Sequence, residues 1–194
     1  MDYVIRPVRA DEWRAAKELR LAALRDPAAP LAFLETYEEA AAQPDEFWRG
    51  RAERAAHGTT VLQFVAENAE GGRWDGSVVA LVEEAGSLDF FGQLVERRQA
   101  QLVAVFVRPE ARGSGVAGAL FSAAVEWAFG LEGVTRVRLY VHEDNRRAEG
   151  FYRKFGFVHT GRVVPKPGAK SGKKPGARAG DPSKVDREME IGRR

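Results

Sequence analysis

Residues 112–118 read RGSGVAG, with glycines at positions 113, 115 and 118. This spacing matches G-x-G-x-x-G, which is typical of loops that bind a pyrophosphate. In such a loop, small residues let consecutive backbone N–H groups point into one concavity, and the dipole of the following helix adds positive potential. The same glycines also suit a plain turn between a strand and a helix. The rest of the chain decides between these two interpretations.

A dinucleotide-binding fold fits the remaining sequence poorly. That fold needs several strand–helix–strand units, and after Asp144 the pattern predicts one short helix and two strands. Before the loop, the strand-like runs 59–67, 77–84 and 99–107 are separated by turn residues, which predicts an antiparallel meander. A P-loop of the Walker type is excluded because no Lys-Ser/Thr pair follows the glycines.

Apolar periodicity places the remaining elements. Helical spacing recurs between residues 10 and 56, with breaks at prolines, and again over 114–129 and 145–155. Strand patterns occupy 3–8 and 134–142, and two more lie near the C-terminus. Strands and helices in this order predict an α+β (mixed α/β) fold, with residues 1–194 as a single domain.

Composition excludes several classes of function. The chain of 194 residues has no cysteine, which rules out disulfides, thiolate metal sites and a covalent cysteine intermediate. Its histidines, His57, His142 and His159, are far apart in sequence, so we expect no metal site and an ordinary packing or surface role for each. No secretory signal or membrane-length apolar run is visible, which predicts a cytoplasmic protein without a membrane partner.

The positive charge is concentrated near the C-terminus. Residues 162–194 hold ten Lys and Arg against four Asp and Glu, whereas the rest of the chain carries a slight excess of acids. Within that region, residues 166–184 are rich in Gly, Pro and Lys, which predicts a flexible basic loop before the last strand. The loop lacks aromatic residues for base stacking, so we expect no nucleic-acid partner.

Two motifs resemble those of the GNAT superfamily of N-acetyltransferases. Residues 105–121, VFVRPEARGSGVAGALF, match its strand and R/Q-x-x-G-x-G/A loop. Residues 139–157, LYVHEDNRRAEGFYRKFGF, match a second motif at the expected distance. The resemblance covers nearly the whole chain except the basic loop. It implies a GNAT-like fold, with a central twisted, mostly antiparallel sheet of about seven strands flanked by about four helices.

The resemblance also implies a reaction and its residues. The reaction is direct transfer of the acetyl group of acetyl-CoA, the co-substrate, to a primary amine in a ternary complex. Tyr152 is similar to the general acid that protonates the leaving thiolate, and packing at helical spacing is its alternative role. Asn145 is similar to the side chain that bonds the pantetheine arm, and a plain helix N-cap is its alternative role. The residues implied to bind the cofactor are Val105, Val107, Arg112, Gly113, Ser114, Gly115, Val116, Ala117 and Asn145.

The sequence leaves the general base and the acceptor open. Gln101 and Tyr140 stand where family members often have glutamate, and neither is an ionised base at neutral pH. A water relay, Glu35 or Glu38, or an amine that arrives neutral are the alternatives. The acids Glu35, Glu38 and Glu39 either attract a cationic amine or form a solvated helix face. Small-molecule amines and protein N-termini or lysines both remain possible acceptors, and so does a homodimer.

The absence of a base in these positions leaves a second class of function. A degenerate module that binds acyl-CoA without catalysis would keep both motifs and lose the chemistry. An amine panel assayed with acetyl-CoA separates this alternative from an enzyme.

Overall fold

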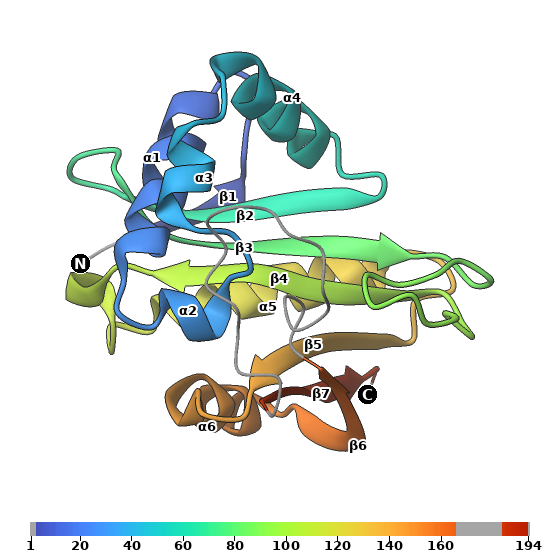
Figure 1. Ribbon diagram of the computed structural model, residues 1–194. Helices are drawn as coiled ribbons and strands as arrows, with labels where there is room; N and C mark the ends of the chain where they lie inside the picture. The colour runs from blue at the N-terminus through green and yellow to red at the C-terminus, as the bar shows by residue number, and fades with distance from the viewer. Residues whose placement is uncertain (1–2, 166–183, 194) are drawn as a thin grey trace.

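A twisted sheet of seven strands organises the chain (Figure 1). The computed structural model describes residues 3–165 and 184–193. Across the sheet the order is β1-β2-β3-β4-β5-β7-β6, so the last strand of the chain lies between β5 and β6. The strands are β1 (Tyr3–Pro7), β2 (Val61–Asn68), β3 (Trp74–Glu83), β4 (Gln99–Val107), β5 (Arg136–His142), β6 (Val158–Pro165) and β7 (Val185–Gly192).

Every neighbouring pair of strands is antiparallel except β4 and β5. The meander expected from the sequence is β2, β3 and β4, which confirms that prediction. β4 and β5 are parallel because a long helix crosses between them, as any parallel connection requires. The mixed α/β class and the mostly antiparallel sheet of seven strands are both confirmed.

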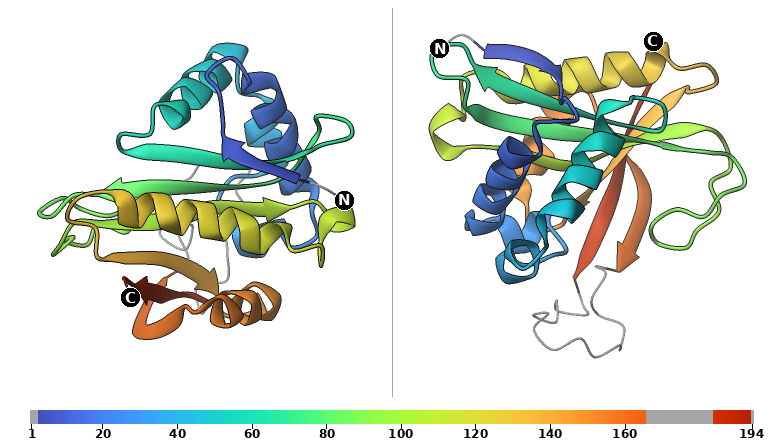
Figure 2. Two further views of the ribbon diagram at one scale, coloured as in Figure 1. Left: turned by 180° about the vertical axis from the view of Figure 1, so that it is seen from behind. Right: turned by 90° about the horizontal axis from the view of Figure 1, so that it is seen from above.

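Helices cover both faces of the sheet (Figures 1 and 2). α5 and α6 lie on one face, and α1 to α4 lie on the other. None of the described helices is long and apolar enough to cross a membrane. The described residues form six α-helices and a short 3-10 helix: α1 (Trp13–Arg25), α2 (Ala29–Ala32), α3 (Tyr37–Ala41), α4 (Asp45–Ala56), η1 (Pro109–Ala111), α5 (Val116–Gly130) and α6 (Arg146–Phe155).

The number of helices exceeds the four or so expected because the second helical region, residues 29–56, is divided into α2, α3 and α4. α2 ends at Ala32, and a new N-terminus forms at Thr36. There the Thr36 hydroxyl accepts from the Glu39 N–H at 3.2 Å, and the Glu39 carboxylate accepts from the Thr36 N–H at 2.9 Å. This reciprocal capping box fixes the start of α3.

The core under α5 and α6 is built around the ring of Phe121. Phe121 is fully buried on α5, where it stacks on Tyr152 at 5.4 Å between ring centroids and meets Phe151 edge-on at 5.0 Å. Phe155 and Phe157 complete the cluster. Aromatic pairs at these separations add to the stabilisation from apolar burial. The cluster joins α5 to α6 and holds the last helix against the sheet.

We expect Phe121→Ala to lower the free energy of unfolding by about 3–5 kcal/mol, because a buried ring is replaced by a cavity. Urea denaturation measures the loss. The matched control is Phe90→Ala, whose side chain is 66% exposed and which should change stability by no more than about 0.5 kcal/mol. Equal effects of the two substitutions would contradict this description of the core.

Candidate functional site

The central parallel pair of strands separates along its length. β4 and β5 share two registered pairs, Ala100 with Val137 and Gln101 with Arg138. Beyond them β4 runs on to Val107 and β5 to His142 without further registered pairs, and the two strands diverge toward their C-terminal ends (Figure 1). An opening of this kind leaves backbone groups of a sheet interior available to a bound chain.

A bulge in β4 accompanies this divergence. Between β3 and β4 the register passes from Ser77–Phe106 to Val79–Val103, so three steps on β4 face two on β3. Within the bulge, Ala104 has a φ of 54°, the one non-glycine residue with positive φ in the described part of the chain. That conformation costs an L-residue about 1–2 kcal/mol. Bulges bend a strand and increase its twist, which turns β4 away from β5.

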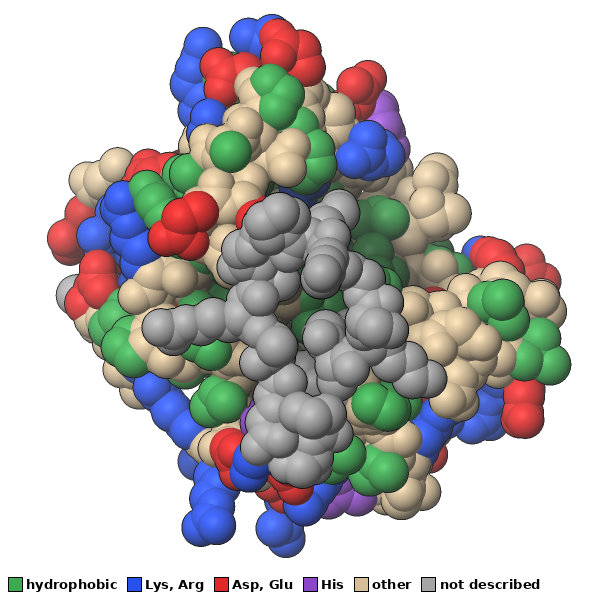
Figure 3. Space-filling model, viewed as in Figure 1, with side chains coloured by type: hydrophobic (Ala, Val, Ile, Leu, Met, Phe, Trp, Pro, Cys, Tyr) green, Lys and Arg blue, Asp and Glu red, His purple; other side chains and the backbone are tan. Residues whose placement is uncertain are grey.

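A cavity of about 940 Å³ lies where the strands separate. Its wall includes Gln101 to Val105 of β4 and Leu139 to His142 of β5. Asn145 and Tyr152 line it from the side of α6, while Arg20 and Arg51 line it from the side of α1 and α4. A volume of this size suits a small-molecule ligand. On the face seen in Figure 3, charged side chains lie mostly toward the margin, and hydrophobic ones are visible at several places closer in.

The glycine loop follows β4 directly and ends at the N-terminus of α5. Gly113 has a φ of 85° and Gly115 a φ of 90°, a conformation that L side chains rarely adopt. A Cβ at either position would meet nothing within 4 Å, so the space above the loop is open. Gly115 is the N-cap of α5 and offers no side-chain cap, which leaves the first N–H groups of the helix, including those of Val116 and Ala117, to another acceptor. The loop therefore fits an anionic group.

Two side chains of the loop, Arg112 and Ser114, make contacts within the protein that stabilise its shape. Arg112 donates from Nε to the carbonyl of Val107 at 2.9 Å and pairs with the carboxylate of Asp26. Burial raises the pKa of Asp26, but the N–H of Ala28 and the guanidinium of Arg112 outweigh it and hold that pKa below its ordinary value. Ser114 donates from Oγ to the carbonyl of Ala111 at 2.7 Å. The charge of Arg112 is therefore largely neutralised by Asp26.

Asn145 and Tyr152 both lie on the cavity wall. Asn145 caps α6, since its Oδ1 accepts from the N–H of Ala148 at 3.3 Å, and its Nδ2 has no partner among the described residues. The N-cap role is thus present, and the amide nitrogen remains available. Tyr152 is 8% exposed, and burial raises the pKa of its phenol. Its hydroxyl has no hydrogen-bond partner in residues 3–165 and 184–193.

Gln101 and Tyr140, the two positions considered for a general base, provide no ionised base. Gln101 is buried in the cavity wall. Burial raises the pKa of Tyr140, and its hydroxyl donates to Glu188 at 3.0 Å while accepting from Arg138 at 2.8 Å. His142 lies in the wall as well, and its Nδ1 accepts from the N–H of Asp144 at 3.1 Å. A neutral imidazole bonded in this way carries its proton on Nε2, which makes it a donor toward its surroundings.

The three glutamates of the second helical region differ in position. Glu35 and Glu39 line the cavity, whereas Glu38 is exposed and lies outside its wall. Glu35 pairs with Arg20 at 2.6 Å, and Glu39 belongs to the capping box of α3. Both cavity glutamates therefore have partners within the protein.

A buried ion network closes the other end of the strand separation. Arg138 of β5 is 1% exposed in its side chain and contacts Glu83 and Glu188 at 2.8 Å and Asp89 at 2.9 Å. Arg136 adds a contact of 3.5 Å to Glu188. The network joins β3, β5, β7 and the loop after β3 beside the last registered pair of β4 and β5.

Sequence reasoning missed this network and the arginines in the cavity wall. Arg138 and its acids are 49 to 55 residues apart in sequence. Arg20 and Arg51 come from different helices, and the helical patterns marked neither as a site residue. His142 was expected to be ordinary, and only the course of β5 places it in the cavity wall. In the described residues, no group of three His, Cys, Asp or Glu is placed to hold a metal ion.

Comparisons with known proteins agree with this geometry. A family model described as Acetyltransferase (GNAT) family matches residues 19–157. No curated protein matches the sequence significantly. An acetyltransferase of the GNAT family from Streptococcus pneumoniae superposes with a TM-score of 0.70 at 17% identity, covering 98% of this chain and 99% of that one.

Two further solved structures carry acetyl-CoA. NAA60 from Arabidopsis thaliana, in complex with acetyl-CoA, gives a TM-score of 0.68 at 15% identity and covers 98% of both chains. A phosphinothricin acetyltransferase from Sinorhizobium meliloti, in complex with AcCoA, gives 0.69 at 18% identity, covering 99% of this chain and 89% of that one. At these identities the likeness concerns the fold.

The ion network predicts a specific loss of stability in acid. Burial raises the pKa of Asp89, but N–H groups and Arg138 outweigh it, and the pKa lies below its ordinary value of 3.8. A carboxylate whose pKa is lower in the folded than in the unfolded state stabilises the fold at pH values above the unfolded-state pKa. This contribution is lost as the pH falls through the folded-state pKa. We therefore expect Asp89→Asn to be less stable than wild type at pH 7, with the gap narrowing below about pH 4. Urea denaturation across this range tests the expectation, and a gap that stays constant would refute it.

Proposed function

The chain belongs to the acetyltransferase (GNAT) family, and we propose on that premise that it transfers the acetyl group of acetyl-CoA directly to a primary amine. One observation carries the proposal: Tyr152 and Asn145 line the cavity at the strand separation, and the glycine loop follows β4, the strand that forms one wall of that cavity. The loop alone is compatible with a plain turn. Its position directly after β4, which forms one wall of the cavity, supports a role in binding a ligand.

The described residues fit acetyl-CoA along its length. The uncapped N–H groups of α5, at Val116 and Ala117, and the open backbone of Gly113 to Gly115 suit the pyrophosphate. The unpaired edge of β4 from Val105 to Val107 suits the peptide-like pantetheine arm, with the qualification that the Val107 carbonyl already accepts from Arg112. We assign to Arg112 and Ser114 the holding of the loop, and to Asn145 both the helix cap and a bond to the arm through Nδ2.

Acetyl-CoA supplies the thioester whose acetyl group is transferred. The carbon–sulfur bond breaks as the amine nitrogen forms the new amide bond, so the sulfur must gain a proton and the nitrogen must lose one. We assign the first proton to Tyr152, because a phenol with its ordinary pKa of about 10 is protonated at neutral pH. Burial raises the pKa of Tyr152 further. The absence of cysteine from the chain favours direct transfer over a covalent intermediate.

The acceptor is an amine, and its identity is not fixed by the family. The solved relatives include enzymes named for spermidine and for phosphinothricin, and a bisubstrate-analogue complex of NAA60. The alternative function is an acyl-CoA-binding module without turnover. Two residues favour it: Gln101 cannot act as a base, and the hydroxyl of Tyr140 is already hydrogen-bonded to Glu188. Release of free thiol from acetyl-CoA across a panel of amines separates the two.

We expect Tyr152→Phe to lower kcat by roughly 10- to 1000-fold, since it deletes the proton donor. The ring that stacks on Phe121 is kept, so the melting temperature and the KM for acetyl-CoA should barely change. Steady-state kinetics and thermal denaturation provide both readouts. A kcat within about twofold of wild type, with chemistry rate-limiting, would show that Tyr152 only packs.

Gly115→Asp should abolish the rise in melting temperature that CoA or acetyl-CoA causes in the wild type. The substitution strains a residue with a φ of 90° and places a negative charge where the pyrophosphate is proposed to bind. Gly133→Asp is the matched control, because Gly133 also has a positive φ, 76°, but lies beyond the opposite end of α5. Loss of the CoA effect in both variants, or a thermal shift with NAD in place of CoA, would argue against the assignment.

A further inference from the structure

Arg51 of α4 is a cation in the cavity wall without an acidic partner. It is half-buried, and no carboxylate in the described residues lies within ion-pair distance of its guanidinium. Its nearest recorded contact is the ring of Trp48, 5.9 Å away. Burial and the neighbouring charge of Arg20 lower the pKa of Arg51, and the carboxylate of Glu35, beyond ion-pair distance, opposes them only in part. A charge held in this way is costly to the fold unless a counter-ion arrives.

Arg20 of α1 adds to the excess of positive charge. It pairs with Glu35 at 2.6 Å and stacks over the ring of Phe33 at 4.2 Å, so the one carboxylate near both guanidinium groups is paired with Arg20. Four other acids of the cavity wall are engaged elsewhere: Glu83 and Asp89 with Arg138, Glu84 with Arg98, and Glu39 with the N–H of Thr36. Asp186, the remaining acid, lies on β7, at the far side of β5 from the two arginines.

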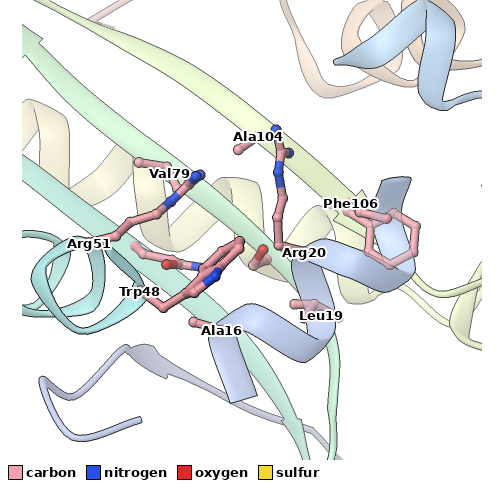
Figure 4. A pocket seen from close by; sticks show the side chains of 11 residues that line it. Ala16, Leu19, Arg20, Trp48, Arg51, Val79, Ala104 and Phe106 are labelled. Atoms are coloured by element: carbon pink, nitrogen blue, oxygen red, sulfur yellow. The ribbon is translucent and has the colours of Figure 1, made fainter. Parts of the chain in front are cut away.

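Both arginines reach toward the bulge of β4. Figure 4 shows Arg20 extending from its helix toward Ala104 and Arg51 extending toward Val79. They also line a second cavity of about 20 Å³, against which Trp48 and Ala104 pack. Trp48 is 1% exposed, and its Nε1 has no hydrogen-bond partner among the described residues. Donors without acceptors are thus concentrated beside the point where β4 leaves β5.

We propose that Arg51, together with Arg20, binds a carboxylate carried by the acceptor, so that the substrates are amines with an anionic group, of the amino-acid type. The inference rests on the proposed function, since it names the class of amine that enters the same cavity. It reverses the sequence interpretation in which Glu35, Glu38 and Glu39 attract a cationic amine. In the structure Glu35 neutralises Arg20 and Glu38 lies outside the wall, so the uncompensated charge beside the bulge is positive.

The test compares amines with the same side chain, with the α-carboxylate present or replaced by a neutral carboxamide. L-Leucine, L-phenylalanine, L-methionine and L-glutamate are each assayed beside their α-carboxamides, for acetylation and for binding to the CoA-loaded protein by calorimetry. We expect at least one carboxylate to exceed its amide by about tenfold or more in kcat/KM and in affinity, as a charged hydrogen-bonded pair provides. In Arg51→Gln this preference should fall to about one, a change of roughly tenfold or more.

Arg54→Gln is the matched control, because Arg54 is an exposed arginine on the same helix. It should retain the full preference for carboxylates. The melting temperature of Arg51→Gln should equal or exceed that of wild type, since the substitution removes an unpaired charge; a merely structural arginine would lower it.

The outcomes separate the two proposals. Arg51-dependent binding of a carboxylate without acetylation of any amine supports this inference and overturns the proposed function. Acetylation of amines without a preference for the carboxylate, or a preference that survives Arg51→Gln, overturns the inference and leaves the proposed function standing. Failure of every carboxylate in the panel to bind or react also overturns the inference.

Discussion

The ion pairs of Arg138 are the constraint on which the site depends. This buried guanidinium contacts Glu83, Asp89 and Glu188, and it thereby links β3, β5, β7 and the loop after β3. Removing one partner of such a network leaves uncompensated charge in a dry environment, which is far more costly than the net value of any one pair. The network therefore holds the strands together beside the pair Gln101–Arg138, and the separation of β4 from β5 begins there.

From this fixed end the two strands diverge, and the bulge at Ala104 supplies the bend. The strain of a positive φ at an alanine is tolerated because the surrounding sheet holds it. The result is a cavity between the two helical layers. Tyr152 of α6 lines it from one side, and Arg20 of α1 and Arg51 of α4 line it from the other. The loop after β4 is stabilised separately, through Arg112 and Asp26. The sites proposed for cofactor and acceptor thus depend on different supporting elements.

Local patterns in the sequence predicted much of this arrangement. The meander, the long helix after the glycines and the cap at Asn145 each depend on residues close in sequence, and the structure confirms them. The motifs also identified the family. The division between α2 and α3 was missed because it depends on the reciprocal bonds of Thr36 and Glu39, which act against a helical pattern that continues across them. Most of the expected flexible loop, 166–184, lies outside the described residues and stays a prediction.

Charges brought together by topology were beyond sequence reasoning. The partners of Arg138 are distant along the chain, and the environment of Arg51 depends on how α4 lies over the sheet. Arg112 was expected among the cofactor-binding residues, and its contact with Asp26 joins two residues that are 86 positions apart in sequence. In each case the sequence shows the charge but not the partner that determines its use.

The central claim is that the acetyl group passes directly from acetyl-CoA to an amine inside the opening between β4 and β5. Initial rates of thiol release, measured while acetyl-CoA and an accepted amine are varied together, test this most directly. Direct transfer within a ternary complex predicts double-reciprocal lines that intersect. Parallel lines, together with an acetylated form of the protein detected by mass spectrometry after mixing with acetyl-CoA alone, would contradict it.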